Sequence, residues 1–187
     1  MQHRRTKVAS AVAAACAIGV GAVAVADNGR RSDREALTGF EEVPAVSTPG
    51  VGEFRTSINR AGDQVRYKLS FSGLESAVTQ AHIHFENETN NGPVIVFLCS
   101  NLTGPPPGTQ ACPAAGGTIR GTITADDVGG GGASQGLAAG EIEEFTRAIR
   151  AGATYVNVHS VGRPGGEIRA QLGDDHDHDH DHDRDDD

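Results

Sequence analysis

Apolar and polar residues alternate with a period of two over most of residues 36–172. The clearest run is 65–72, in which every second residue is apolar and the residues between them are polar or charged. Such a run predicts a half-buried antiparallel strand whose apolar side chains face a core. Similar runs and apolar stretches predict about seven further strands, near 36–40, 54–58, 79–85, 94–98, 119–123, 155–159 and 168–172.

Segment 94–98 is apolar at every position, which predicts a central strand covered on both faces. Turn residues separate the runs, with Ala-Gly-Asp at 61–63 and Pro-Gly-Gly at 164–166. Many short strands with Gly- and Pro-containing turns predict an all-β protein. We expect an antiparallel Greek-key or immunoglobulin-like β-sandwich of about eight strands.

One segment departs from the period of two. Between residues 140 and 152, Ile142, Phe145 and Ile149 recur at helical spacing, with acidic residues before them and arginines after them. This charge order suits the helix dipole, so the segment predicts one short helix. Residues 127–136, with four consecutive glycines at 129–132, predict a flexible loop before it.

The two ends of the chain differ from this body. Residues 1–26 hold a short basic segment, an uncharged Ala/Val/Gly-rich stretch and Ala-Val-Ala at 24–26, the layout of a secretory signal peptide. A membrane anchor is the alternative, but the stretch is only weakly hydrophobic and at the lower length limit for a span. We therefore expect cleavage before Asp27, a loose leader over 27–35, no membrane span in the mature chain, and a secreted or extracytoplasmic location in the periplasm or at the cell surface.

Cleavage would remove Cys16 and leave Cys99 and Cys112. An even number of cysteines in an exported chain predicts one disulfide. Closing a loop of this length stabilises a fold by roughly 3 kcal/mol in the chain-entropy model.

Of the 187 residues, the last fourteen (174–187) carry a net charge of −8, against −9 for the whole chain. Without apolar residues, this tail is expected to be disordered. Four histidines alternate with aspartates, a composition suited to divalent metals such as Zn, Ni or Cu, although a merely solubilising tail is the alternative. These histidines are His176, His178, His180 and His182. The acidic balance also argues against nucleic acid as a partner.

Four ordered motifs resemble the CHRD domain, a module named from chordin and also common in bacterial secreted proteins. They are LTGFEEVP at 37–44, AHIH at 81–84 with NGPV at 91–94, IRAG at 149–152 leading into YVNVH at 155–159, and PGGEIR at 164–169. The resemblance implies an extracytoplasmic, immunoglobulin-like β domain over 36–173. It implies no catalytic residues.

The body holds three histidines, His82, His84 and His159. The strand period places His82 and His84 on the face opposite Ala81 and Ile83, and places His159 on the outer face of a later strand. If the two strands are neighbours, the imidazoles converge as ligands for Cu or Zn. Hydrogen bonding to loops is the alternative role.

The HxH pair and the later histidine weakly resemble copper–zinc superoxide dismutase, although no second histidine cluster is present to bind zinc. Arg163, Glu167 and Arg169 could form an anion or partner site, but we expect a cross-strand Glu–Arg pair on a solvated face instead.

Three functions follow from these observations. The first is an exported, non-enzymatic binding module that binds divalent metal through its tail and its body histidines. The second is a copper-dependent redox enzyme of superoxide dismutase type on His82, His84 and His159. The third is an extracellular adhesion or protein-interaction module whose tail only solubilises it.

Overall fold

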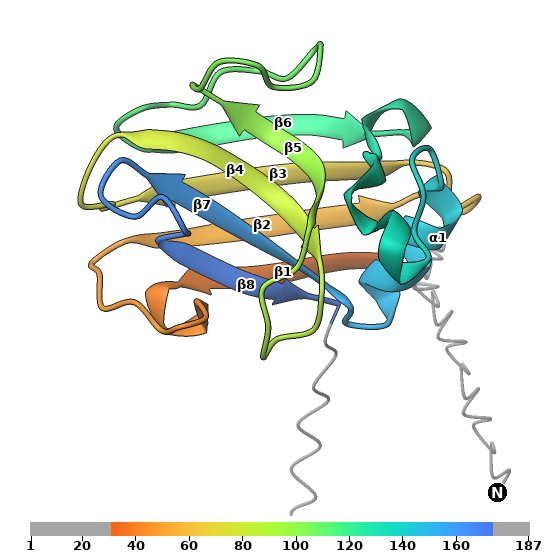
Figure 1. Cartoon of the computed structure of the whole chain (residues 1–187), viewed down its shortest axis with the longest axis horizontal. Helices are drawn as coiled ribbons and strands as arrows, with labels where there is room; N and C mark the ends of the chain where they lie inside the picture. Colours follow the sequence, from red (N-terminus) through yellow and green to blue (C-terminus); the bar gives the residue numbers. More distant parts are fainter. Residues whose placement is uncertain (1–30, 174–187) are drawn as a thin grey trace, which may run out of the picture.

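Strands form at each segment where the alternating pattern predicts them (Figure 1). The computed structural model describes residues 31–173. Its strands are β1 (Arg31–Thr38), β2 (Val51–Ile58), β3 (Val65–Ser72), β4 (Val78–Phe85), β5 (Val94–Ser100), β6 (Gly117–Ile123), β7 (Thr154–Ser160) and β8 (Ile168–Leu172). In β3 the four apolar residues are buried and the residues between them are partly or fully exposed, as the period of two requires.

The eight strands belong to one antiparallel sheet in the order β5-β4-β7-β8-β1-β2-β3-β6. The prediction of an all-β protein is therefore confirmed, but the strands are not divided between the two separate sheets of a sandwich. Strands β8 and β1 join through a single register pair, Thr38 with Arg169. The sheet bends there, so that its two four-stranded halves face each other in a nearly closed barrel (Figure 1).

The core lies between these two halves. It contains large apolar side chains from both, among them Phe54 and Leu69 from one half and Ile83 and Val156 from the other, all fully buried. Burial of apolar area contributes about 25 cal/mol per Å², which makes this shared core the main source of stability.

The predicted helix is confirmed as α1 (Ile142–Arg150). It buries Phe145 and Ile149 and covers one end of the barrel (Figure 1). The chain leaves the helix through Gly152, whose positive φ of 67° is a conformation that glycine adopts without strain.

The prediction of a central strand at 94–98 is wrong, because β5 is an edge strand that pairs only with β4. Its apolar residues are covered instead by the segment that was expected to be a flexible loop. The 3₁₀ helix η2 (Ala125–Asp127) leads into this segment, which forms a second 3₁₀ helix, η3 (Gly130–Gln135). The Gly129 amide donates to the Ile95 carbonyl over 2.8 Å. A Cβ atom at Gly131 would lie 2.1 Å from the Val94 carbonyl oxygen, so only glycine permits this approach.

Strand β1 begins at Arg31, and its whole length pairs with β2. Residues 31–35 are therefore part of the sheet and not part of a leader. The predicted signal peptide (1–26), the rest of the leader (27–30) and the tail (174–187) lie outside the described residues. Within residues 31–173, no helix has the length and apolar character needed to cross a membrane.

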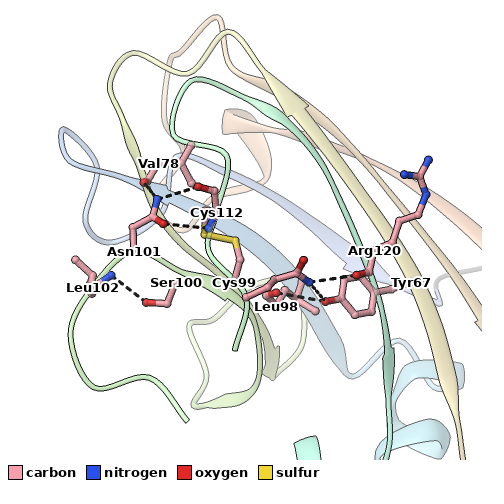
Figure 2. The surroundings of a disulfide bond; sticks show 10 residues. Tyr67, Val78, Leu98, Cys99, Ser100, Asn101, Leu102, Cys112 and Arg120 are labelled. Carbon is pink, nitrogen blue, oxygen red and sulfur yellow. Dashed lines mark hydrogen bonds between the residues drawn. A yellow bond between two sulfur atoms is a disulfide. The ribbon is translucent and has the colours of Figure 1, made fainter. Parts of the chain in front are cut away.

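Cys99 and Cys112 form the predicted disulfide, which ties β5 to the loop before β6. Figure 2 shows Asn101 beside it, donating to the carbonyls of Val78 and Cys112 and accepting from the Cys112 amide. The bridge and this one side chain fix the long loop against β4 and β5.

Candidate metal centre

The three body histidines converge on adjacent strands of the sheet. His82 and His84 lie on β4, which pairs with the β7 strand that carries His159. Ala81 and Ile83 are fully buried in the core, so the histidines point to the opposite face, as the sequence predicts. One ligand nitrogen from each ring lies within 4.8 Å of those of the other two.

This outer face is buried, because other side chains and loops cover it. The exposed fractions of His82, His84 and His159 are 3%, 7% and 6%. The ring of Phe97 lies edge-on to His82 with centroids 4.4 Å apart, and Tyr155 stacks on His84 at 4.6 Å and 4°. The register between β4 and β5 shifts immediately before His82 and again immediately before His84, and such irregularities are common near functional sites.

Two of the rings are held by backbone carbonyls. His84 Nδ1 lies 2.9 Å from the Gly92 oxygen, and His159 Nδ1 lies 3.0 Å from the Pro164 oxygen. A carbonyl oxygen only accepts, so in each ring Nδ1 carries the hydrogen and Nε2 retains a lone pair. This arrangement, with one nitrogen anchored and the other free to ligate, is typical of metal-binding histidines.

The two Nε2 atoms point to the same place. They lie 3.1 and 3.0 Å from Oδ1 of Asn157, whose side chain sits between His84 and His159. A ring nitrogen that carries only a lone pair cannot hydrogen-bond to this oxygen, so pairing with both rings requires the Asn157 amide to be turned with its NH₂ group toward them, unless a cation lies between them. The group of acceptors is therefore arranged for a shared donor or a shared cation.

His82 has a different environment. Both of its ring nitrogens are buried, and neither has a hydrogen-bond partner in the described part of the chain. A buried polar group left unpaired costs about 1–3 kcal/mol. Hydrogen bonding to loops therefore does not explain why a histidine stands at this position, whereas a ligand role does.

Electrostatics keep the three rings neutral. Burial, with the neighbouring His159 and His84, lowers the pKa of His82 to about 3, and burial lowers the pKa of His84 to about 4. Burial also lowers the pKa of His159, although its bond to the Pro164 carbonyl opposes the shift. Neutral imidazole is the form that binds metal, so at neutral pH no proton has to be displaced.

Glu167 and Arg169 do not form the solvated pair that the sequence predicts, because both side chains are buried. Arg169 lies 3.5 Å from the centre of the Tyr155 ring and donates to the carbonyls of Asn87, Glu88 and Asn90 at 3.0–3.2 Å. It thus holds the 86–93 loop over the outer face of the sheet. The carboxylate of Glu167 accepts from Thr48 and from the Glu75 amide instead.

Sequence reasoning identified the three histidines but missed the roles of Tyr155, Asn157 and Arg169. The strand period was the available signal, since it places Tyr155 and Asn157 on the same face as His159. The other predicted ligands are the four tail histidines, which lie outside the described residues. Cys99 and Cys112 are bonded to each other, so neither offers a thiolate.

Three neutral imidazoles can hold one transition-metal ion and leave a further coordination position open. Ion–nitrogen bonds of about 2.0–2.1 Å require ligand nitrogens roughly 3.3–3.6 Å apart. The 4.8 Å limit is wider by about 1.2–1.5 Å, a difference that side-chain rotation can close.

A comparison with known protein families matches residues 34–172 to the CHRD domain, and the match covers the whole sheet beyond the first three residues of β1. A search of curated proteins and a search of solved structures each returned no match. The chain belongs to the CHRD domain family.

Proposed function

We propose that this CHRD-domain protein is an exported, non-enzymatic binding module that holds a transition-metal ion on His82, His84 and His159. The observation that carries the proposal is the convergence of three buried imidazoles, with one nitrogen of each within 4.8 Å of the others. The buried, unpaired ring nitrogens of His82 also support it, because leaving them unpaired costs stability that a bound ion would restore.

The position of the ligands on strands supports this function. His82, His84 and His159 lie on neighbouring strands whose pairing fixes their relative height. The Gly92 and Pro164 carbonyls also orient two of the rings. Rings that are already oriented by such hydrogen bonds lose little conformational freedom when the site binds an ion.

The tail (174–187) is a second metal-binding element, which binds more weakly than the three body histidines. Its four histidines (His176, His178, His180 and His182) offer imidazole to Zn, Ni or Cu, and the aspartates lower the cost of bringing a cation near. Export fits the basic and apolar start of the chain and the Cys99–Cys112 disulfide, which is typical of oxidising compartments.

The test has to separate the body site from the tail. In the full chain with all four tail histidines changed to asparagine, titration with copper, zinc or nickel should show one equivalent bound more tightly than about micromolar. Adding His82→Leu should abolish this binding. A matched control is Gln80→Leu, which makes a similar change on the same face of β4, two residues earlier, and should leave binding intact. Binding that is absent, or that survives His82→Leu, would refute the body site.

A copper-dependent redox enzyme of superoxide dismutase type is a second candidate. The observation in its favour is that three histidines on a nearly closed antiparallel sheet hold the ligand atoms together. Copper-loaded protein that removes superoxide faster than free copper, and loses this activity with His82→Leu, would favour the enzyme over the binding module.

The third candidate is an adhesion or protein-interaction module with a solubilising tail. It is supported by family membership alone. Metal analysis distinguishes it, because this candidate requires no metal on the body or on the tail.

A further inference from the structure

We infer that the site formed by His82, His84 and His159 selects copper in its monovalent state over divalent zinc, nickel and copper. This inference rests on the proposed function, since it names the ion that the same site takes. Four features of the site support it: the charge of its ligands, its burial, the cation beside it and the number of its ligands.

The ligands bring no negative charge. The group consists of three histidines, and within residues 31–173 no carboxylate or thiolate joins it. Asn157, the other side chain directed at the two Nε2 atoms, is also neutral. An ion bound here therefore keeps its full formal charge, whereas a cysteine or aspartate ligand would reduce it.

Burial makes that charge expensive. The three histidine side chains are at most 7% exposed, and Phe97 covers His82. The cost of moving an ion from water into a medium of low polarity rises with the square of its charge, so it is about four times greater for a divalent than for a monovalent ion of similar size. The site therefore favours the lower charge.

A fixed cation lies next to the site. Arg169 lies over Tyr155 at 3.5 Å, and Tyr155 stacks on His84 at 4.6 Å. Only the ring of Tyr155 separates its guanidinium from the His84 ring, so the fixed charge repels further positive charge held there. The same repulsion acts twice as strongly on a divalent ion as on a monovalent one.

The neighbouring acids compensate only in part. Glu42 is 5% exposed, and burial raises its pKa to about 7 against the opposing effect of Arg169. It therefore carries only part of a negative charge at neutral pH. Glu86, which also faces Arg169 and Tyr155, is partly exposed, and its charge is better screened by water.

The ligand number points in the same direction. Zinc completes four-coordination with a water when a protein supplies three ligands. Monovalent copper forms stable complexes with two or three nitrogens and needs no further ligand. Because Asn157 already lies against two of the three ligating rings, room for a water is limited.

The test is a competition titration without oxygen, in the full chain with the four tail histidines changed to asparagine. Bicinchoninate serves as the competitor for monovalent copper, and a chromophoric chelator serves for zinc and nickel. We expect monovalent copper to bind at least about 100-fold more tightly than zinc or nickel. The reduction potential of the bound copper should lie above that of aqueous copper, since the monovalent state is the one stabilised.

Two variants of opposite charge test the cause. Arg169→Gln should raise zinc affinity about tenfold relative to monovalent copper, because the nearby repulsion is gone. Glu42→Gln should change the ratio in the opposite direction at pH 8, where the wild-type carboxyl is charged. Arg169 also anchors a loop, so circular dichroism has to show that its variant is folded; Glu42→Gln provides the same test without loss of that anchor.

The outcomes separate the two proposals. If zinc or divalent copper binds as tightly as monovalent copper, the inference is wrong and the proposed metal site stands. If no ion binds to the body, both are wrong. If selectivity is present but neither charge variant changes it, the electrostatic cause is wrong and with it the inference as argued.

Discussion

His82→Leu should make the metal-free protein more stable, although it removes one of the three proposed metal ligands. The two ring nitrogens of His82 are buried without partners, and leucine has a similar volume and no polar atom. Removing an unpaired buried polar group of this kind should gain about 1–3 kcal/mol in the free energy of unfolding. For a domain of this size, that corresponds to about 3–10 °C in Tm.

His84→Leu is the matched comparison on the same face of the same strand. Both nitrogens of His84 are paired, with Gly92 and Asn157, and its ring stacks on Tyr155. The substitution leaves the Gly92 carbonyl without its donor and removes the stacking. We expect it to lower the free energy of unfolding by about 1–3 kcal/mol, the opposite sign to His82→Leu.

The assay is urea unfolding at pH 7.5 in the presence of a chelator, followed by circular dichroism. Equal m-values for all three proteins would show that the midpoints report stability. If His82→Leu is less stable than wild type by more than about 1 kcal/mol, the His82 nitrogens are satisfied in the folded protein and the argument for an intended ligand fails. In a second series with added copper and no chelator, copper should stabilise the wild type but neither variant.

Four further outcomes follow from the structure. As pH falls from 7 to 5, His82 and His84 should each cost the metal-free protein about 2 kcal/mol of stability. Their folded pKa values of about 3 and 4 lie below the unfolded value near 6.5, so protonation favours the unfolded chain; urea midpoints across that range measure the loss. The pH dependence from Glu42 has the opposite direction, because burial raises its folded pKa to about 7 and stability is lost as pH rises from 4.5 through 7. Relative to wild type, Glu42→Gln should therefore become about 3 kcal/mol more stable as pH rises from 4 to 8, measured in the same assay. Replacing Cys99 and Cys112 by alanine should lower the free energy of unfolding by about 3 kcal/mol, and an unchanged urea midpoint would contradict the stabilising role of the bridge. Deleting residues 174–187 should abolish retention on a nickel column at pH 7.5 while leaving the body site; undiminished retention would show that the tail is not the ligand.

Local periodicity explains why so much of the fold could be predicted. In β3 the alternation of Val65, Tyr67, Leu69 and Phe71 with polar residues becomes an alternation of buried and exposed positions. The helical spacing of Phe145 and Ile149 likewise becomes the buried face of α1. Such patterns depend on which side of one element faces the core, and that information is local.

The same reasoning failed at β5 and β1. Apolar residues at 94–98 predicted a central strand, but an edge strand covered by Gly129 and η3 has the same composition. The polar start of β1 predicts a leader, whereas its backbone pairs with β2 from Arg31 onward. Backbone pairing is open to polar residues, so polarity alone did not exclude a strand.

For the candidate site, the sequence by itself determined which residues share a face: His82 with His84, and Asn157 with His159. Only the tertiary structure decided that β4 and β7 are neighbours, that this outer face is buried and that Arg169 lies beside it. The physical reason is that side-chain direction follows from the two-residue period of one strand, whereas strand order, burial and charge environment arise from contacts between residues far apart in the chain.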